Sequence, residues 1–186
     1  DDNSFSRPPS SAQMGIDYNQ RTSIGSLKFS TDLYGKYNSF VNSADSGTTN
    51  EEFSFQYGVS TLISAPFYAN GKSKLILLKP KLLLSFNDQE NDILGDYFMG
   101  TEELTWGNIY SSKKIRSLTE SETGLSVSLG IERQVFWENG RHLELSFAAS
   151  KINNLTYSPS PTLGLEAQDF NYLGKLSYRT ENANTF

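Results

Sequence analysis

The single histidine of this chain, His142, is the residue whose type and surroundings could do chemistry. Imidazole is the only side chain whose ordinary pKa lies near neutrality, so it is the natural general base. Ser126, Ser128 and Ser146 lie on the same predicted polar strand face, next to Glu144, and suggest a serine hydrolase as one alternative. Serine is common on any polar strand face, and we therefore expect neither enzymatic activity nor a catalytic residue.

Acidic side chains gather in one segment. Residues 87–122 hold eight acids and three bases, a balance of −5 that equals the net charge of the whole chain. Asp88, Glu90, Asp92 and Asp96 could bind a hard cation through oxygen atoms, but the glycine of an EF-hand loop is missing. We expect a solvated acidic loop, with no metal and no cofactor. The negative net charge also argues against nucleic acid as a partner.

The stretch that would position His142 is a hairpin over residues 123–150. Apolar residues alternate with polar ones before and after Asn139-Gly140, and this period of two predicts strands with one apolar and one polar face. Asn-Gly favours the positive φ angles of a two-residue turn. The chain has 37% hydrophobic and 13% aromatic residues, which suits alternating strands better than a core buried on two sides.

The same alternation recurs along the chain and predicts about six strands. Besides the two strands of the hairpin, we expect strands over residues 26–37, 53–65, 75–86 and 169–179. Pro80 lacks an N–H and requires a bulge or weakens its strand. Residues 1–22 are predicted to be a polar loop or tail, with a short strand near residues 14–18 as an alternative. Residues 23–180 are predicted to be the β domain, and residues 181–186 a polar tail.

The predicted connections alternate in length. They are long at residues 38–52, 87–122 and 151–168, and short at 68–72 and 138–141. In an up-and-down meander the long loops would share one end and the tight turns the other, as in outer-membrane barrels. The predicted fold is therefore all-β, an antiparallel up-and-down transmembrane β-barrel. Six strands are too few to close such a barrel, so we expect the chain to be part of a larger one.

This interpretation assigns side chains to two faces and two rims. The lipid-facing wall is predicted to comprise Leu27, Phe29, Leu33, Phe55, Tyr57, Val59, Leu125, Val127, Leu129, Ile131, Leu143, Leu145, Phe147, Tyr172 and Leu176. The predicted lumen-facing residues are Gln56, Ser60, Ser128, Glu132, His142, Glu144, Ser146 and Lys175. The predicted interfacial aromatics are Phe67, Tyr68, Phe86, Phe136, Trp137 and Phe170. A soluble β-sandwich binding module uses the same alternation and stays open as an alternative.

Five segments follow one another in a distinctive order: the proline-containing strand 77–82, the long acidic loop 87–122, the strand entry 122–130, and the segments 163–166 and 169–176. Taken together, they resemble the C-terminal barrel of the outer-membrane lipopolysaccharide-assembly family LptD. The resemblance covers about residues 53–180.

Membership of that family would imply a function and a set of partners. The barrel would insert lipopolysaccharide into the outer leaflet of the Gram-negative cell outer membrane. It would contact outer-membrane lipid, enclose an LptE-like lipoprotein plug, and receive its cargo from the periplasmic lipopolysaccharide-transport bridge. A porin or receptor-type channel for small solutes is the alternative within the same fold.

Overall fold

The fold is a single antiparallel sheet. The structure is a computed structural model that describes residues 10–43, 49–90, 104–111, 122–155 and 170–180. The strands are β1 (Ser10–Ile24), β2 (Leu27–Ser43), β3 (Thr49–Ser64), β4 (Phe67–Gly71), β5 (Lys74–Glu90), β6 (Glu122–Trp137), β7 (His142–Leu155) and β8 (Phe170–Arg179). No helix in these described ranges is long and apolar enough to cross a membrane.

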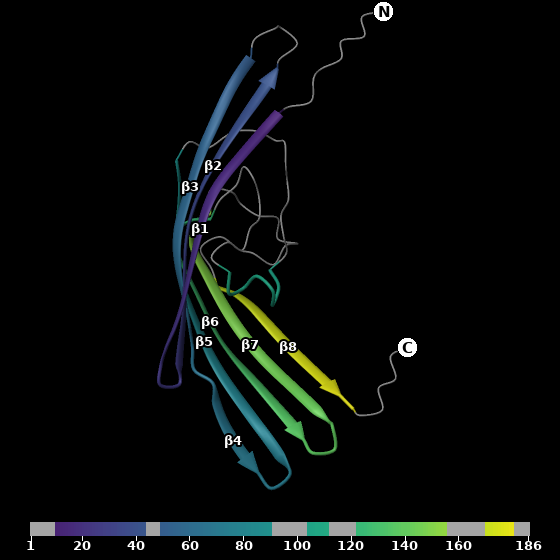
Figure 1. Ribbon diagram of the computed structural model, residues 1–186. Coiled ribbons are helices and arrows are strands. Elements are labelled where there is room, and N and C mark those ends of the chain that lie inside the picture. Colours follow the sequence, from purple (N-terminus) through teal and green to yellow (C-terminus); the bar gives the residue numbers. More distant parts are fainter. Residues whose placement is uncertain (1–9, 44–48, 91–103, 112–121, 156–169, 181–186) are drawn as a thin grey trace, which may run out of the picture.

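The strands follow one another as an up-and-down meander. The order in the sheet is β1-β2-β3-β5-β6-β7-β8, with β4 paired to β5, and every pairing is antiparallel. The sheet is strongly curved, and its tight turns lie together at the lower end (Figure 1). β1 and β8 are its two edges and do not pair with each other in the part of the chain described. The predicted all-β meander is confirmed, while the sheet remains open.

The prediction of six strands was wrong because two strands were missed. Ser10–Ile24 forms β1, although we predicted residues 1–22 to be a loop or tail; residues 1–9 lie outside the described part. β1 pairs with β2 along its whole length, from Ser10↔Val41 to Ile24↔Leu27, across a turn with Gly25 at φ 61°. Polar side chains dominate this strand, so its apolar alternation was weak while its backbone still found a partner.

The other added strand, β4, continues β3 in the same register. β3 pairs with β5 as far as Ser64↔Lys81, and β4 resumes at Phe67↔Leu78 with no residue gained or lost. Between them, the Ala65 amide donates to the Pro80 carbonyl at 3.2 Å. Pro80 has no N–H to return, so the ladder is interrupted there. Toward β6 the register runs through Pro80↔Ile131 without a shift, so of the two alternatives considered for Pro80 the bulge does not occur.

The predicted long connections are shorter than expected, because the strands extend beyond their apolar alternation. β2 ends at Ser43 and β3 begins at Thr49, which leaves residues 44–48 instead of 38–52. By the same extension, 87–122 shrinks to 91–121 and 151–168 to 156–169. Polar residues pair through their backbones as well as apolar ones do. Connections at the tight-turn end are still shorter than those at the opposite end.

The hairpin predicted over residues 123–150 is confirmed, with a different turn. Gly140 has φ 74°, and the Trp137 amide donates to the Arg141 carbonyl at 3.0 Å, so three residues form the loop. The β4–β5 turn lies at residues 72–73, at the C-terminal end of the predicted short connection 68–72. Gly124, at φ 85°, lies where the β6–β7 register shifts by one residue, a bulge near the far end of the hairpin.

Candidate functional site

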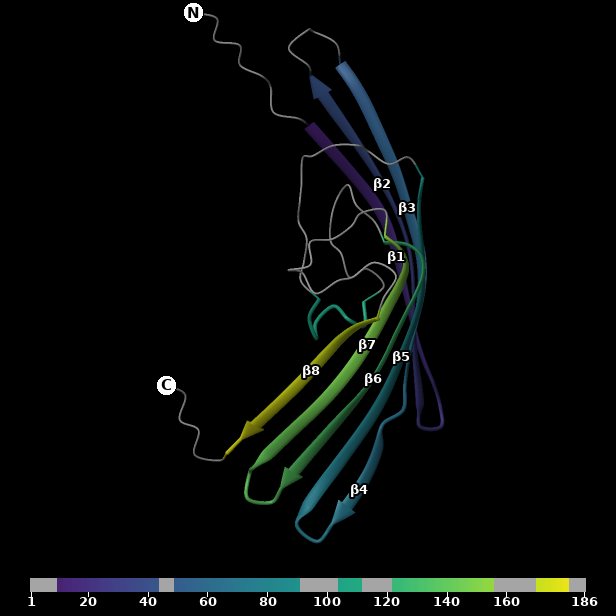
Figure 2. The same ribbon diagram turned by 180° about the vertical axis from the view of Figure 1, so that it is seen from behind.

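The two faces of the sheet differ in chemistry, and the usual relation between polarity and burial is inverted. Only six described hydrophobic residues are buried, against thirteen buried polar ones, while twenty-six large hydrophobic residues are exposed. By register, all but Tyr68, Leu75 and Phe136 of those twenty-six lie on one face, which we call the outward face. The opposite face is concave and carries the buried serines and asparagines; we call it the inner face (Figure 2).

The fifteen residues predicted for an apolar wall all share the outward face. Twelve of them are exposed, which is unusual for apolar side chains: Leu129 is 51% exposed, Phe147 52% and Leu176 73%. Phe29, Val127 and Leu143 are half-buried. The strand period of two and the continuous register explain this, since Leu82, Leu129, Ala149 and Tyr172 form one row across four strands. Nothing in the described part of the chain covers this wall.

The eight residues predicted to line a lumen share the inner face, and four of them, Gln56, Ser60, Ser128 and Ser146, are buried there. Ser128 bonds to Ser150 at 2.9 Å, in line with their register, and Ser85 bonds to Ser126 at 2.6 Å. Lys175 of β8, which is exposed, forms an ion pair with Glu144 at 2.8 Å on the inner face. Hydroxyl pairs and ion pairs between neighbouring strands satisfy buried polar groups that would otherwise be costly.

A segment from the long β5–β6 connection, residues 104–111, lies on the inner face (Figure 2). It folds into a single turn in which the Ile109 amide donates to the Thr105 carbonyl at 3.0 Å. Leu104 and Ile109 are buried against Ala148 of β7, and Trp106, Tyr110 and Leu173 pack around them. This apolar contact therefore holds the segment, which we call the seated segment, against the mostly polar inner face.

Tyr110 connects the seated segment to β5 and β6. Lys81 lies with its Nζ 4.7 Å from the centre of the Tyr110 ring, and the same ammonium pairs with the carboxylate of Glu132. Burial, together with the nearby negative charge of Glu132, raises the pKa of Tyr110 to about 12. The phenol lies where a Cβ on Gly130 would project, so β6 needs a glycine at this position to admit the ring.

A second aromatic ring covers a glycine on the same face. Tyr34, Gly58 and Asn87 form one row across β2, β3 and β5. The Tyr34 ring lies beside Gly58, where a Cβ would meet its Cε1 at 2.7 Å, and its hydroxyl donates to Asn87 Oδ1 at 2.9 Å. The ring thus bridges three strands at a position that any larger residue would block.

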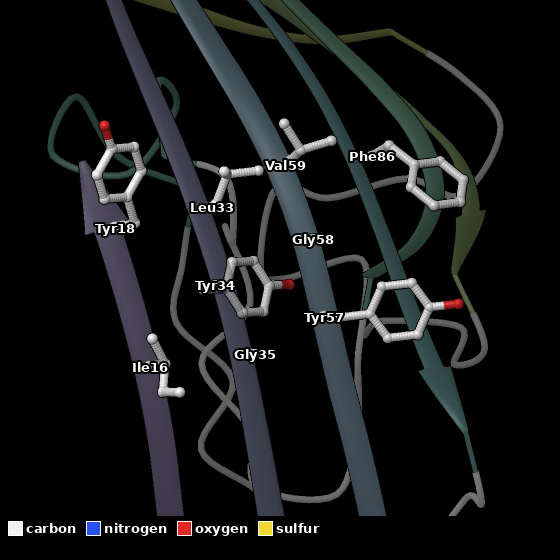
Figure 3. A pocket seen from close by; sticks show the side chains of 9 residues that line it. All are labelled: Ile16, Tyr18, Leu33, Tyr34, Gly35, Tyr57, Gly58, Val59 and Phe86. Atoms are coloured by element: carbon white, nitrogen blue, oxygen red, sulfur yellow. The ribbon is translucent and has the colours of Figure 1, made fainter. Parts of the chain in front are cut away.

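The outward face carries two shallow apolar grooves. One, of about 450 Å³, lies over Gly35 and is bordered by Ile16, Leu33 and Tyr57 among others (Figure 3). The second, of about 550 Å³, crosses β5, β6 and β7 and is lined by Pro80, Ile131, Phe147 and Ala149 among others. Both form where small residues interrupt rows of large ones.

The predicted interfacial aromatics divide between the faces. Phe67, Phe86, Trp137 and Phe170 lie on the outward face near strand ends. The register puts Tyr68 and Phe136 on the inner face. Phe136 stacks on His142, with ring centres 4.4 Å apart and planes 9° apart. That these six aromatics lie at a membrane interface stays a prediction.

The geometry does not assemble a serine–histidine pair. Ser146 lies four residues from His142 on the same strand, about 13 Å away at the usual strand rise. Ser126 and Ser128 bond to other serines. In the described residues, no group of three or more histidine, aspartate or glutamate side chains could hold a metal. Asp92 and Asp96 lie outside those residues; Tyr57 donates to Asp88 at 2.8 Å.

Sequence reasoning missed the seated segment and the two covered glycines. The available signal was the cluster Trp106, Ile109 and Tyr110 inside an otherwise acidic connection, together with glycines at inner-face positions. Comparisons with family models, with curated proteins and with solved structures find no match for this chain.

Proposed function

We propose that this chain forms part of the wall of a transmembrane outer-membrane β-barrel. The observation that carries the proposal is the inversion of its faces: large apolar side chains are exposed, while serines and asparagines are buried. Water-soluble sheets bury their apolar face, whereas a barrel in lipid turns it outward and keeps a polar interior.

Strand length and layout support the same proposal. A tilted strand crosses the hydrocarbon with roughly 9–11 residues. β2, β3, β5, β6 and β7 have 14 to 17 residues, enough to cross and project beyond the membrane. Short turns at one end and longer connections at the other match the periplasmic and extracellular ends of such barrels.

Within this class, we propose lipopolysaccharide assembly in the cell outer membrane. Its support is the resemblance of residues 53–180 to the LptD barrel, together with an inner face that suits an amphiphile's polar part. On this proposal lipopolysaccharide passes along the inner face, a lipoprotein plug occupies the lumen, and periplasmic bridge components deliver the lipid. The seated segment would then be one of the elements that fill the interior.

Photo-crosslinking at neighbouring β8 positions tests this function. Ser177 lies on the inner face and Tyr178 on the outward face, and both are exposed near the tight-turn end. A benzophenone amino acid is placed at either position in the full chain in its native membrane. We expect lipopolysaccharide adducts at Ser177 and phospholipid adducts at Tyr178.

Other outcomes identify the alternatives. A channel would give no lipopolysaccharide adduct at Ser177 and would conduct ions in planar bilayers. A soluble β-sandwich module would give no lipid adduct at either position and would stay monodisperse without detergent.

A further inference from the structure

The outward face carries one arginine in an apolar setting. Arg133 of β6 lies between Leu78 of β5 and Leu145 of β7 in the register, with Ile131 and Val135 two positions away along its own strand. It is exposed, and no described carboxylate forms an ion pair with it. A guanidinium on an apolar wall needs an anionic or hydrated partner.

The 550 Å³ groove begins beside this arginine. Its border residue Ile131 precedes Arg133 by two positions on the same face, about 7 Å along the strand. From there the groove extends across β5, β6 and β7, between the row of Pro80, Ile131 and Phe147 and the next row away from the turn, which contains Leu82, Leu129 and Ala149. A cationic group on the turn side of an apolar trough matches a molecule with an anionic head and a hydrocarbon tail.

The charge of the tight-turn end favours an anionic occupant. Within five residues of the three tight turns there are six bases, Arg21, Lys28, Lys72, Lys74, Arg133 and Arg141, and two acids, Glu138 and Glu144. Arg133 lies four residues from Trp137, the last residue of β6. That places it about 13 Å from the end of the strand, within reach of the headgroup level for a long side chain.

We propose that this groove binds an anionic phospholipid of the surrounding membrane, with its phosphate on Arg133 and an acyl chain over Pro80 and Ala149. The proposal rests on the proposed membrane location. Each basic group near a membrane surface favours an anionic lipid by about fivefold, so a moderate but measurable preference is expected.

A tryptophan inside the groove can report the occupant. Phe147→Trp, made in the full chain with Trp106→Phe and Trp137→Phe, leaves one tryptophan at the groove border. The protein is reconstituted in phosphatidylcholine vesicles with equal fractions of brominated phosphatidylcholine or brominated phosphatidylglycerol, which quench tryptophan on contact. We expect phosphatidylglycerol to associate about fivefold more strongly at this reporter.

Three matched variants define the site. Arg133→Gln should reduce the ratio of phosphatidylglycerol to phosphatidylcholine association to about one. Ala149→Phe fills the groove and should reduce quenching by both lipids. Lys74→Gln removes an outward base at the same end but away from the groove, and should leave the preference nearly unchanged. A reporter at Leu33, beside the groove of Figure 3, should show no preference, since Arg133 lies on a different part of the sheet.

The failures are distinguishable. Equal quenching by both lipids, or an equal loss for Lys74→Gln and Arg133→Gln, overturns the site while the membrane location stands. No quenching by either lipid at either reporter overturns the membrane location and the site together.

Discussion

A single charge on the outward face separates a lipid-facing wall from a water-facing one. Leu129 lies at the middle of β6, is 51% exposed, and has Leu82 and Ala149 as register partners. In water, Leu129→Arg would forfeit about half the burial of one leucine, roughly 1 kcal/mol, and the guanidinium would stay hydrated. At the centre of a bilayer the same change costs about 2–4 kcal/mol.

Depth provides the control for this prediction. Tyr178 lies on the same face next to the end of β8, so Tyr178→Arg should cost only about 0–1 kcal/mol in a bilayer. Ser128 is unsuitable as a control because it is fully buried and bonded to Ser150. The assay is reversible urea unfolding in phosphatidylcholine vesicles. Equal losses for the two arginine variants, within about 0.5 kcal/mol, would refute the assignment of the outward face to lipid.

Further predictions concern the seated segment. Gly130→Ala should destabilise the protein by about 1–3 kcal/mol, because a Cβ at this position meets Tyr110 and, at 2.9 Å, the Phe147 carbonyl. Gly174 has open space around it, so Gly174→Ala should cost far less in the same urea titration. Lys81→Met should cost about 2 kcal/mol by leaving the partly buried Glu132 without its cation. Adding Glu132→Leu should recover more than half of that loss, as a double-mutant cycle would measure. Because the pKa of Tyr110 is raised, its protonated form stabilises the folded state below pH 10. This part of the free energy of unfolding should be lost as the pH rises from 10 to about 12. In Tyr110→Phe that loss should be absent when unfolding is measured against pH.

The strands with strong two-residue alternation were predictable from the sequence. The β6–β7 hairpin and the two-faced character of β2, β3 and β8 follow from which residues alternate. Side-chain period and register together fix the face of each residue, so the fifteen outward residues could be assigned without coordinates.

The remaining features of the fold depend on backbone pairing between strands, which the sequence of a single strand does not determine. β1 is largely polar, and it is a strand because the backbone of β2 offers partners along its whole length. The ends of β2 and β3 extend beyond the apolar alternation for the same reason. The split between β3 and β4 originates in Pro80, a residue of the neighbouring strand.

The candidate site was predictable in part. The inner-face positions of Glu132 and Ser128 followed from alternation. The packing of residues 104–111 against Ala148 and Leu173 did not, because these residues come from a connection whose composition suggests only a solvated loop. The contact of Tyr110 with Gly130 joins residues that are 20 positions apart, so no local sequence pattern could predict it.

The measurement that tests the central claim most directly is a fluorescent scan along β8. The chain has no cysteine, and residues 174–179 are all exposed, so single cysteines at these positions can each carry one environment-sensitive dye in the reconstituted protein. If the outward face meets lipid, emission at Gly174, Leu176 and Tyr178 shifts to the blue and is quenched by a lipid-borne quencher, while the inner-face positions between them do not respond. Lipid quenching without alternation, or none at any position, would contradict the account.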